Sequence, residues 1–312
     1  MKMKQMIAVS PLQTADKTIW RAEDRPCPVC GSTKRERRGR RGGRAHREGK
    51  GIETNVVQCL DCVVLYTNPT LIPDSNPYAT ETAEEYFQLH SSEQRVKNGE
   101  SLADYAESII GKPGRMLELG CGRGELLAGA ANRGWTVYGV EMTENYAQVA
   151  ESRGVLVERS SIQQSKLLDQ TYDVILMAAI LEHLYDPFET LKKVRDALRP
   201  GGLVFIDVPN ELSLTMCIGN LYMRAQGKDA VVNLSPTFSP FHVVGFSPAS
   251  LRRALSAAGF RVHTLETPKW NNALPEGGSL LKRIERFVFG TAQTIGARIG
   301  MGDGVACWAV RE

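Results

Sequence analysis

The chain has 312 residues, of which 42% are hydrophobic and 23% charged, and it carries a net charge of +3. This composition excludes collagen-like and disordered chains, and the length suits one large domain plus a small one. No run approaches the roughly 20 apolar residues of a membrane span, and the first residues lack the apolar core of a signal peptide. We therefore expect a cytoplasmic protein without a membrane span. The charge is uneven, because residues 34–50 contain nine Lys or Arg against two Glu.

Four of the seven cysteines form two close pairs, Cys27 with Cys30 and Cys59 with Cys62. A disulfide framework is unexpected without a secretion signal, whereas two CxxC turns can supply the four thiolates of a tetrahedral zinc site. Apolar runs at 56–58 and 63–66 predict ribbon strands around the second pair, and the basic segment 34–50 reads as a loop inserted between strands. Four thiolates leave no open coordination position, so the predicted zinc is structural. Reduced thiols without metal remain the alternative.

Changes of pattern along the chain predict four segments. Residues 1–25 form a lead-in, 26–72 the two-CxxC unit, 73–111 a linker with helices that lead into the next domain, and 112–312 an α/β domain. The helical pattern of the linker rests on Tyr86, Phe87, Leu89, Leu102, Tyr105 and Ile109.

Short apolar runs alternate with helical segments from Arg115 onward, which is typical of a parallel α/β sheet. The expected strands are Met116–Leu119, Thr136–Glu141, Val155–Glu158, Tyr172–Met177, Leu203–Val208, Phe260–Glu266 and Gly304–Val310. The expected helices begin near Gly124, Asn145, Ser161, Pro187 and Ser247, and another covers about Leu280–Phe289. Residues 210–245 follow the fifth strand, at the sheet edge where open α/β sheets bind ligands, and we interpret them as a substrate cap.

The sharpest motif is Glu118-Leu-Gly120-Cys-Gly122-Arg-Gly124, which follows an apolar strand and precedes a helix. Glycines remove Cβ atoms, so the chain can turn tightly and lie against a ligand. Glu141 ends the next strand, where a carboxylate can accept hydrogen bonds from both ribose hydroxyls of a nucleoside. The combination of strand, glycine turn, helix, strand and acid predicts a nucleoside site.

These residues, together with Tyr172–Met177, Leu181–Pro187, Leu198–Phe205 and His242–Pro248, resemble class I S-adenosylmethionine-dependent methyltransferases over about residues 110–312. The resemblance implies a Rossmann-like seven-stranded sheet whose last strand is antiparallel between its neighbours. The cysteine unit resembles bacterial methyltransferases in which a small N-terminal zinc ribbon precedes the catalytic domain. Those proteins are often linked to sugar, polysaccharide or secondary-metabolite modification. One departure is Val63, which stands where glycine usually follows the second pair.

The resemblance also assigns roles in binding S-adenosylmethionine. Glu118 would help to hold the methionine amino group, Glu141 would bind the ribose, and Ala178 would lie beside the sulfonium. The glycines Gly120, Gly122 and Gly124 would line the methionine and ribose end, and Ser161 and Ile162 would contact the adenine edge.

Methyl transfer needs alignment of acceptor, methyl and sulfur, and exclusion of water. A general base helps when the acceptor is a hydroxyl, and an imidazole titrates in the right range. His242, which follows the cap, and His183, which follows the fourth strand, are the candidate catalytic residues. A purely packing role is equally open for each of them. The apolar residues Met216, Tyr222, Met223, Phe238 and Phe241 of the cap are candidates to line the pocket.

Three functions remain open. The first is methyl transfer from S-adenosylmethionine to a small-molecule or glycan-type acceptor. The second is methylation of RNA or of the translation machinery, with the ribbon and the Arg-rich loop binding phosphates. The third is a cofactor-binding scaffold that has lost catalysis.

Overall fold

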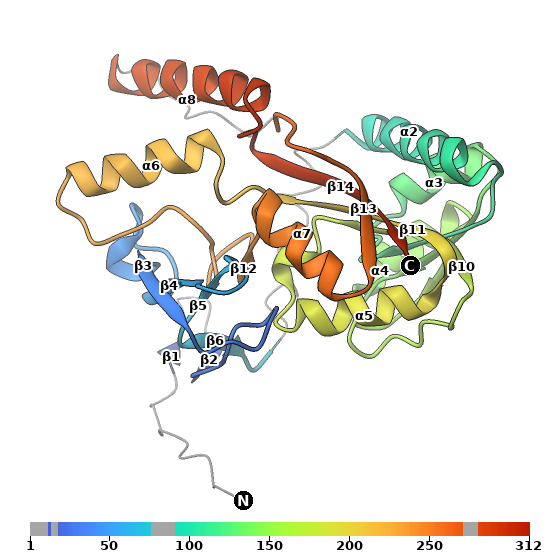
Figure 1. Cartoon of the computed structure of the whole chain (residues 1–312), viewed down its shortest axis with the longest axis horizontal. Coiled ribbons are helices and arrows are strands. Elements are labelled where there is room, and N and C mark those ends of the chain that lie inside the picture. Colours follow the sequence, from blue (N-terminus) through green and yellow to red (C-terminus); the bar gives the residue numbers. More distant parts are fainter. Residues whose placement is uncertain (1–11, 14–17, 76–90, 271–279) are drawn as a thin grey trace, which may run out of the picture.

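A seven-stranded sheet forms the centre of the computed structural model, whose described residues are 12–13, 18–75, 91–270 and 280–312 (Figure 1). The strand order is β13-β14-β11-β10-β7-β8-β9, and β14 runs antiparallel to both of its neighbours. This confirms the expected Rossmann-like sheet and the antiparallel last strand. The strands are β7 (Arg115–Leu119), β8 (Thr136–Val140), β9 (Leu156–Glu158), β10 (Tyr172–Ala178), β11 (Leu198–Pro209), β13 (Phe260–Glu266) and β14 (Gly304–Arg311).

Helices cover both faces of the sheet (Figure 1), because successive strand side chains point to opposite faces and both sets are apolar. Met116 packs in the cluster under α2 and α3, whereas its neighbour Leu117 packs in the cluster with residues of α5 and α7. The helices are α2 (Ser92–Ile110), α3 (Glu125–Asn132), α4 (Glu144–Ser152), α5 (Pro187–Ala197), α6 (Leu214–Ala225), α7 (Pro248–Ala257) and α8 (Leu280–Arg298). Within the described residues, no helix is long and apolar enough to cross a bilayer.

Two helix predictions differ from the structure. No helix begins at Ser161, where the chain makes a turn instead, and the ammonium of Lys193 binds the carbonyls of Ile162 and Gln163 that a helix would have used. The helix expected to end at Phe289 continues to Arg298, because Gly290 does not interrupt it. In the linker, α2 contains Leu102, Tyr105 and Ile109, whereas Tyr86, Phe87 and Leu89 lie outside the described residues.

The cysteine unit contributes three strands to a second sheet, of order β12-β5-β4-β3. Its strands are β3 (Arg35–Arg41), β4 (Thr54–Cys59), β5 (Leu65–Thr67) and β12 (Val244–Gly245). The last of these follows the cap segment, so the cysteine unit and the α/β domain share one sheet. They also share one apolar core, in which Val57 and Tyr66 join Phe246 and Leu251. A smaller sheet joins β1 (Leu12–Gln13), β2 (Ile19–Glu23) and β6 (Thr70–Pro73).

The basic segment is ordered where a loop was expected. Its first half is β3, and a short helical turn, η1 (Gly43–Ala45), follows it. The edge of β3 bonds to the cap: the Arg40 N–H donates to the Asp229 carbonyl (3.2 Å), and the Val231 N–H donates to the Arg40 carbonyl (3.0 Å). The cap therefore supplies the backbone partners that a solvated loop would have lacked.

Candidate functional site

The glycine turn between β7 and α3 is built as the motif predicts. Gly120, Gly122 and Gly124 have φ angles of 69°, 54° and 73°, a region that favours glycine. A Cβ on Gly120 would lie 2.3 Å from Cδ1 of Ile180, so even alanine would not fit there without movement. The turn lies at the carboxyl ends of the parallel strands, the edge where open α/β sheets bind ligands.

Glu141 is held in place by the same turn. The Gly122 N–H donates to Oε2 of Glu141 (2.9 Å), and the Thr143 N–H donates to Oε1 (2.7 Å). Two backbone bonds fix the carboxylate, and each oxygen retains a lone pair for a further donor. Binding of the ribose by Glu141 stays a prediction.

A buried carboxyl group, Glu118, lies beside the turn, and the partly buried Arg95 acts on it. Glu118 is 1% exposed, and none of the described residues donates a hydrogen bond to its Oε2. Burial raises its pKa to about 8, while the charge of Arg95 on α2 acts in the opposite direction on this pKa. Burial likewise raises the pKa of Asp207, on β11, to about 7, and Arg95 again opposes the shift. An unpartnered buried carboxyl fits an incoming ammonium group, as the assignment of Glu118 to the methionine end requires. Sequence analysis missed Arg95, because no motif marks it.

The remaining predicted cofactor residues lie along the same edge of the sheet. Ala178 is the last residue of β10 and pairs in register with Asp207. The Ser161 hydroxyl accepts a hydrogen bond from the Gln164 N–H (3.3 Å), and the partly buried Ile162 packs against the core. Contact of Ser161 and Ile162 with adenine stays a prediction.

The structure brings His183 and His242 together around one carboxylate. Their rings lie 4.8 Å apart, edge to face, and the Nε2 atoms are 3.8 Å and 3.9 Å from the same Oε1 of Glu182. Glu182 is 2% exposed, and no described residue donates a hydrogen bond to either of its carboxylate oxygens. We call Glu182, His183 and His242 the histidine–glutamate cluster. One donor atom from each lies within 4.8 Å of the others, a spacing that also suits a metal ion.

Backbone hydrogen bonds hold the histidine–glutamate cluster together. Glu182 and His183 belong to a helical turn, η2 (Leu181–His183), directly after β10. The Val243 N–H donates to the Glu182 carbonyl (2.9 Å), and the Ser235 hydroxyl accepts from the His242 N–H (3.1 Å). The end of the cap is therefore fastened to η2 at the residues that carry the imidazoles.

Burial sets the charge state of this cluster. It lowers the pKa of His183 to about 4 and that of His242 well below its usual value, and the neighbouring His183 adds to the latter shift. It also raises the pKa of Glu182 well above its usual value. Both imidazoles are therefore neutral near pH 7 and can accept a proton, but they are weaker bases than the free imidazole on whose titration range their prediction as general bases rested.

The structure gives the surroundings of three predicted pocket-lining residues of the cap, whose contact with an acceptor stays a prediction. Phe241 stacks on Trp20 (ring centroids 6.4 Å apart) in a small core beneath β2. The guanidinium of Arg41 lies over the Phe238 ring at 5.0 Å. Tyr222 is 57% exposed on α6. Packing thus explains Phe238 and Phe241 without a ligand.

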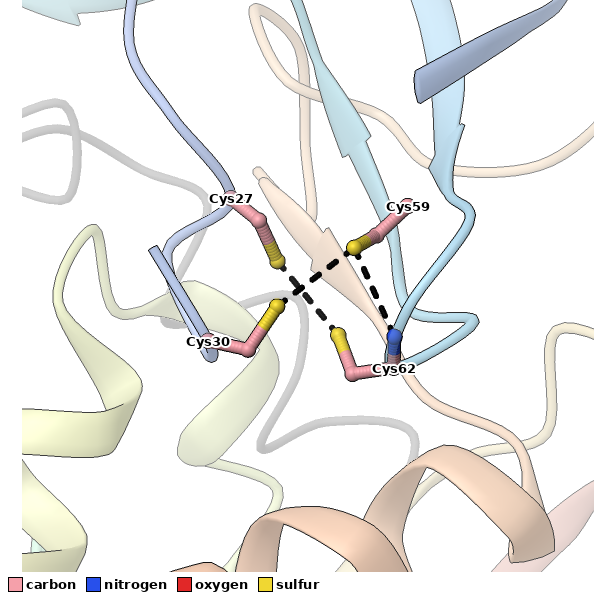
Figure 2. A group of neighbouring side chains, drawn as sticks. All are labelled: Cys27, Cys30, Cys59 and Cys62. Atoms are coloured by element: carbon pink, nitrogen blue, oxygen red, sulfur yellow. Dashed lines mark hydrogen bonds between the residues drawn. The ribbon is translucent and has the colours of Figure 1, made fainter. Parts of the chain in front are cut away.

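The four paired cysteines converge, with their sulfurs pointing toward one another (Figure 2). The Sγ atoms of Cys27 and Cys62 are 3.4 Å apart, and those of Cys30 and Cys59 are 3.5 Å apart. Both distances exceed a disulfide bond, and all four cysteines are free thiols. Four thiolates around a tetrahedral zinc ion would have sulfurs about 3.8 Å apart, from a Zn–S distance of about 2.3 Å. The donor set and its spacing fit zinc.

Comparison with known proteins assigns the family. The profile of a family described as "Methyltransferase domain" matches residues 91–265. The ubiquinone biosynthesis O-methyltransferase of Aeromonas salmonicida is 31% identical over 174 residues, which cover 53% of this chain and 69% of that protein. A probable S-adenosylmethionine-dependent methyltransferase of Mycolicibacterium smegmatis is 30% identical over 154 residues, 47% of this chain and 52% of that protein.

A solved structure shows the same fold. The plantazolicin methyltransferase BpumL in complex with SAH superposes with a TM-score of 0.51 and 16% identity, over 76% of this chain and 91% of that one. The family match, the glycine turn and the oriented Glu141 agree on the same site. This chain belongs to the methyltransferase-domain family and is an S-adenosylmethionine-dependent methyltransferase.

Proposed function

We propose that this enzyme transfers a methyl group from S-adenosylmethionine to a hydroxyl of a small-molecule or glycan-type acceptor, with His242 and His183 handling the acceptor's proton. The histidine–glutamate cluster carries the proposal, because it places two neutral imidazoles and one buried carboxyl after β10, on the sheet edge of the glycine turn. The relative from Aeromonas is named as a ubiquinone biosynthesis O-methyltransferase, which supports a hydroxyl acceptor.

The proton balance of the step follows from the cluster. When bound, S-adenosylmethionine supplies an activated methyl group and a positive charge. The acceptor O–H proton moves to Nε2 of His242 or His183 as its oxygen forms the new bond to carbon. The imidazolium then forms 3.8–3.9 Å from Oε1 of Glu182, whose carboxyl must be ionised to stabilise this charge. Glu182 is thus a positioning residue, and the two histidines are the catalytic ones.

We assign the four converging cysteines to one structural zinc ion. Four thiolates complete a tetrahedral shell, so the metal would bind no acceptor. Its role would be to hold the cysteine turns next to the strands that pack beside η2. One of these strands, β5, pairs with β12, which follows His242 closely in the chain.

The arginines of the basic segment support a small acceptor over RNA. Arg37 makes a two-pronged bond to Asp229 (3.1 Å and 2.5 Å), and Arg40 binds Glu53 (2.8 Å). The Arg41 side chain donates to the Leu234 carbonyl (2.8 Å). Three of the arginines therefore join the ribbon to itself and to the cap, and phosphate binding would have to compete with these bonds.

The test is methyl transfer to a panel of hydroxyl-bearing small molecules and glycans, read as demethylated cofactor formed and a methyl mass gained by the acceptor. We expect His242→Ala and His183→Ala to lower kcat by 10²–10⁴-fold while cofactor affinity stays unchanged. His263→Ala, an exposed histidine on β13, serves as the matched control. Transfer to RNA alone would contradict the acceptor class. Cofactor binding without turnover on any acceptor would favour the scaffold alternative.

A further inference from the structure

An apolar stripe runs along the outer side of α8. Ile284, Phe287, Val288, Ile295 and Ile299 are all exposed, and Phe287 is 74% exposed. At 3.6 residues per turn, Ile284, Phe287, Val288 and Ile295 fall within an arc about 100° wide and span about 16 Å along the axis, and Ile299 directly follows the last helical residue. Thr291 and Arg298 also lie within this arc. Exposed apolar side chains are ordinary when single, but several on one side of a helix indicate an interaction surface.

The stripe is separate from the side of α8 that packs on the protein. Ala292, Gln293 and Gly296 are buried on the packed side, where Gly296 approaches the Met301 carbonyl and Leu214 of α6. Figure 1 shows α8 and α6 extending together to one end of the molecule, away from α2 and α3. The α6 helix adds the exposed Leu221 to this end. The stripe therefore stands on a protruding helix, and its five side chains are exposed within the described part of the chain.

The charges beside the stripe have one sign. Arg283, Arg286 and Arg298 are exposed on α8. The helix contains a single acid, Glu285, which is only 19% exposed and lies 3.7 Å from Arg47 and 3.5 Å from Lys282. A stripe of apolar side chains flanked by arginines, with no exposed acid, is complementary to anionic headgroups above an acyl layer.

We propose that α8 docks this enzyme on the surface of an anionic phospholipid bilayer, with the stripe from Ile284 to Ile299 buried at the headgroup level and the arginines on the phosphates. The helix would lie in the surface, since no described helix is suited to span the layer. A second copy fits less well, because a contact between two such faces would bring two sets of exposed arginines together.

The test is flotation of the full-length protein with vesicles of phosphatidylcholine, with and without phosphatidylglycerol. We expect binding to the anionic vesicles that weakens with salt. The double substitution Ile284→Asp with Phe287→Asp should lower the partition coefficient at least tenfold. Leu168→Asp, which alters an exposed leucine on the loop before β10, should have no effect.

Melting temperature, cofactor affinity and light scattering distinguish a loss of membrane binding from misfolding and from dimer formation. Arg283→Gln with Arg298→Gln should weaken only the binding to anionic vesicles, and melting temperature and cofactor affinity should stay unchanged in all variants. Equal binding by the wild type and the α8 double variant would overturn the proposal. A dimer that Phe287→Asp dissociates, seen by light scattering without vesicle binding, would assign the stripe to a second copy and would also overturn it.

Discussion

His183 and His242 meet edge to face with ring centroids 4.8 Å apart, and both approach the same carboxylate oxygen of Glu182. Neither residue is near the other in sequence, and the contact depends on the bond from the Val243 N–H to the Glu182 carbonyl. A packing role would not require that both nitrogens converge on one buried acid. The convergence therefore gives both histidines a chemical environment whose consequences can be measured.

The pH dependence of stability tests the buried neutral imidazole. The pKa of His183 falls from 6.5 to about 4 on folding, so the unfolded chain binds more protons between these values. The contribution of the neutral imidazole to the free energy of unfolding is therefore fully present above pH 6.5 and is lost as pH falls toward 4. Between pH 7 and pH 4 the free energy of unfolding, measured with urea, should fall by roughly 2–3 kcal/mol less in His183→Gln than in the wild type. The exposed His263→Gln should keep the wild-type slope. An unchanged slope in His183→Gln would show that the imidazole titrates normally.

Substitution of Glu141 tests the cofactor site. The carboxylate is oriented by the N–H groups of Gly122 and Thr143, so Glu141→Gln keeps the shape and removes the charge. Hydrogen bonds to a charged group contribute about 1.5–3 kcal/mol, so we expect cofactor affinity to fall roughly 10–100-fold in calorimetric titration. Glu144→Gln, on the exposed first turn of α4, is the control and should bind as the wild type does. Equal affinities for the two variants would remove Glu141 from the site.

A comparison of alanine substitutions at Gly120 and Gly201 separates the effect of backbone strain from the effect of lost space at the site. Gly120→Ala places a Cβ 2.3 Å from Ile180, at a φ of 69°, and should abolish measurable cofactor binding. Gly201→Ala has a similar φ of 76° with no heavy atom within 4 Å of the new Cβ. It should lower stability by only about 1 kcal/mol and leave cofactor binding intact. Cofactor binding by Gly120→Ala at wild-type affinity would contradict the close approach of Ile180.

Removal of one cysteine tests the zinc assignment. Cys59→Ser should lower bound zinc from one ion per chain to none in elemental analysis and should lower the melting temperature. Methyl transfer should fall as well, because β12 pairs with β5 directly after His242. Cys217→Ser, at an exposed cysteine on α6, is the matched control and should retain zinc. Zinc retained at full stoichiometry by Cys59→Ser would overturn the four-cysteine site.

Local pattern was enough to predict the sheet and the glycine turn. All seven strands of the α/β sheet lie where apolar runs alternate with helical segments, because the central runs bury both faces between helices. Glu118, Gly120, Gly122 and Gly124 belong to one short motif, so their relative placement follows from a single strand and turn. Cys27, Cys30, Cys59 and Cys62 likewise needed only the pairing of β3 with β4 to meet.

The other features of the site and of the basic segment depend on long-range contacts, which no pattern in the sequence could have indicated. Arg95 comes near Glu118 and Asp207 because α2 packs across the sheet edge. The basic segment became β3 because the cap offers it a backbone edge at residues 229–231. The histidine–glutamate cluster exists because the cap returns to η2 before forming β12. Sequence spacing indicates which residues are neighbours within one strand, turn or helix. These three features depend instead on contacts with distant segments, whose backbone must satisfy open hydrogen-bonding groups.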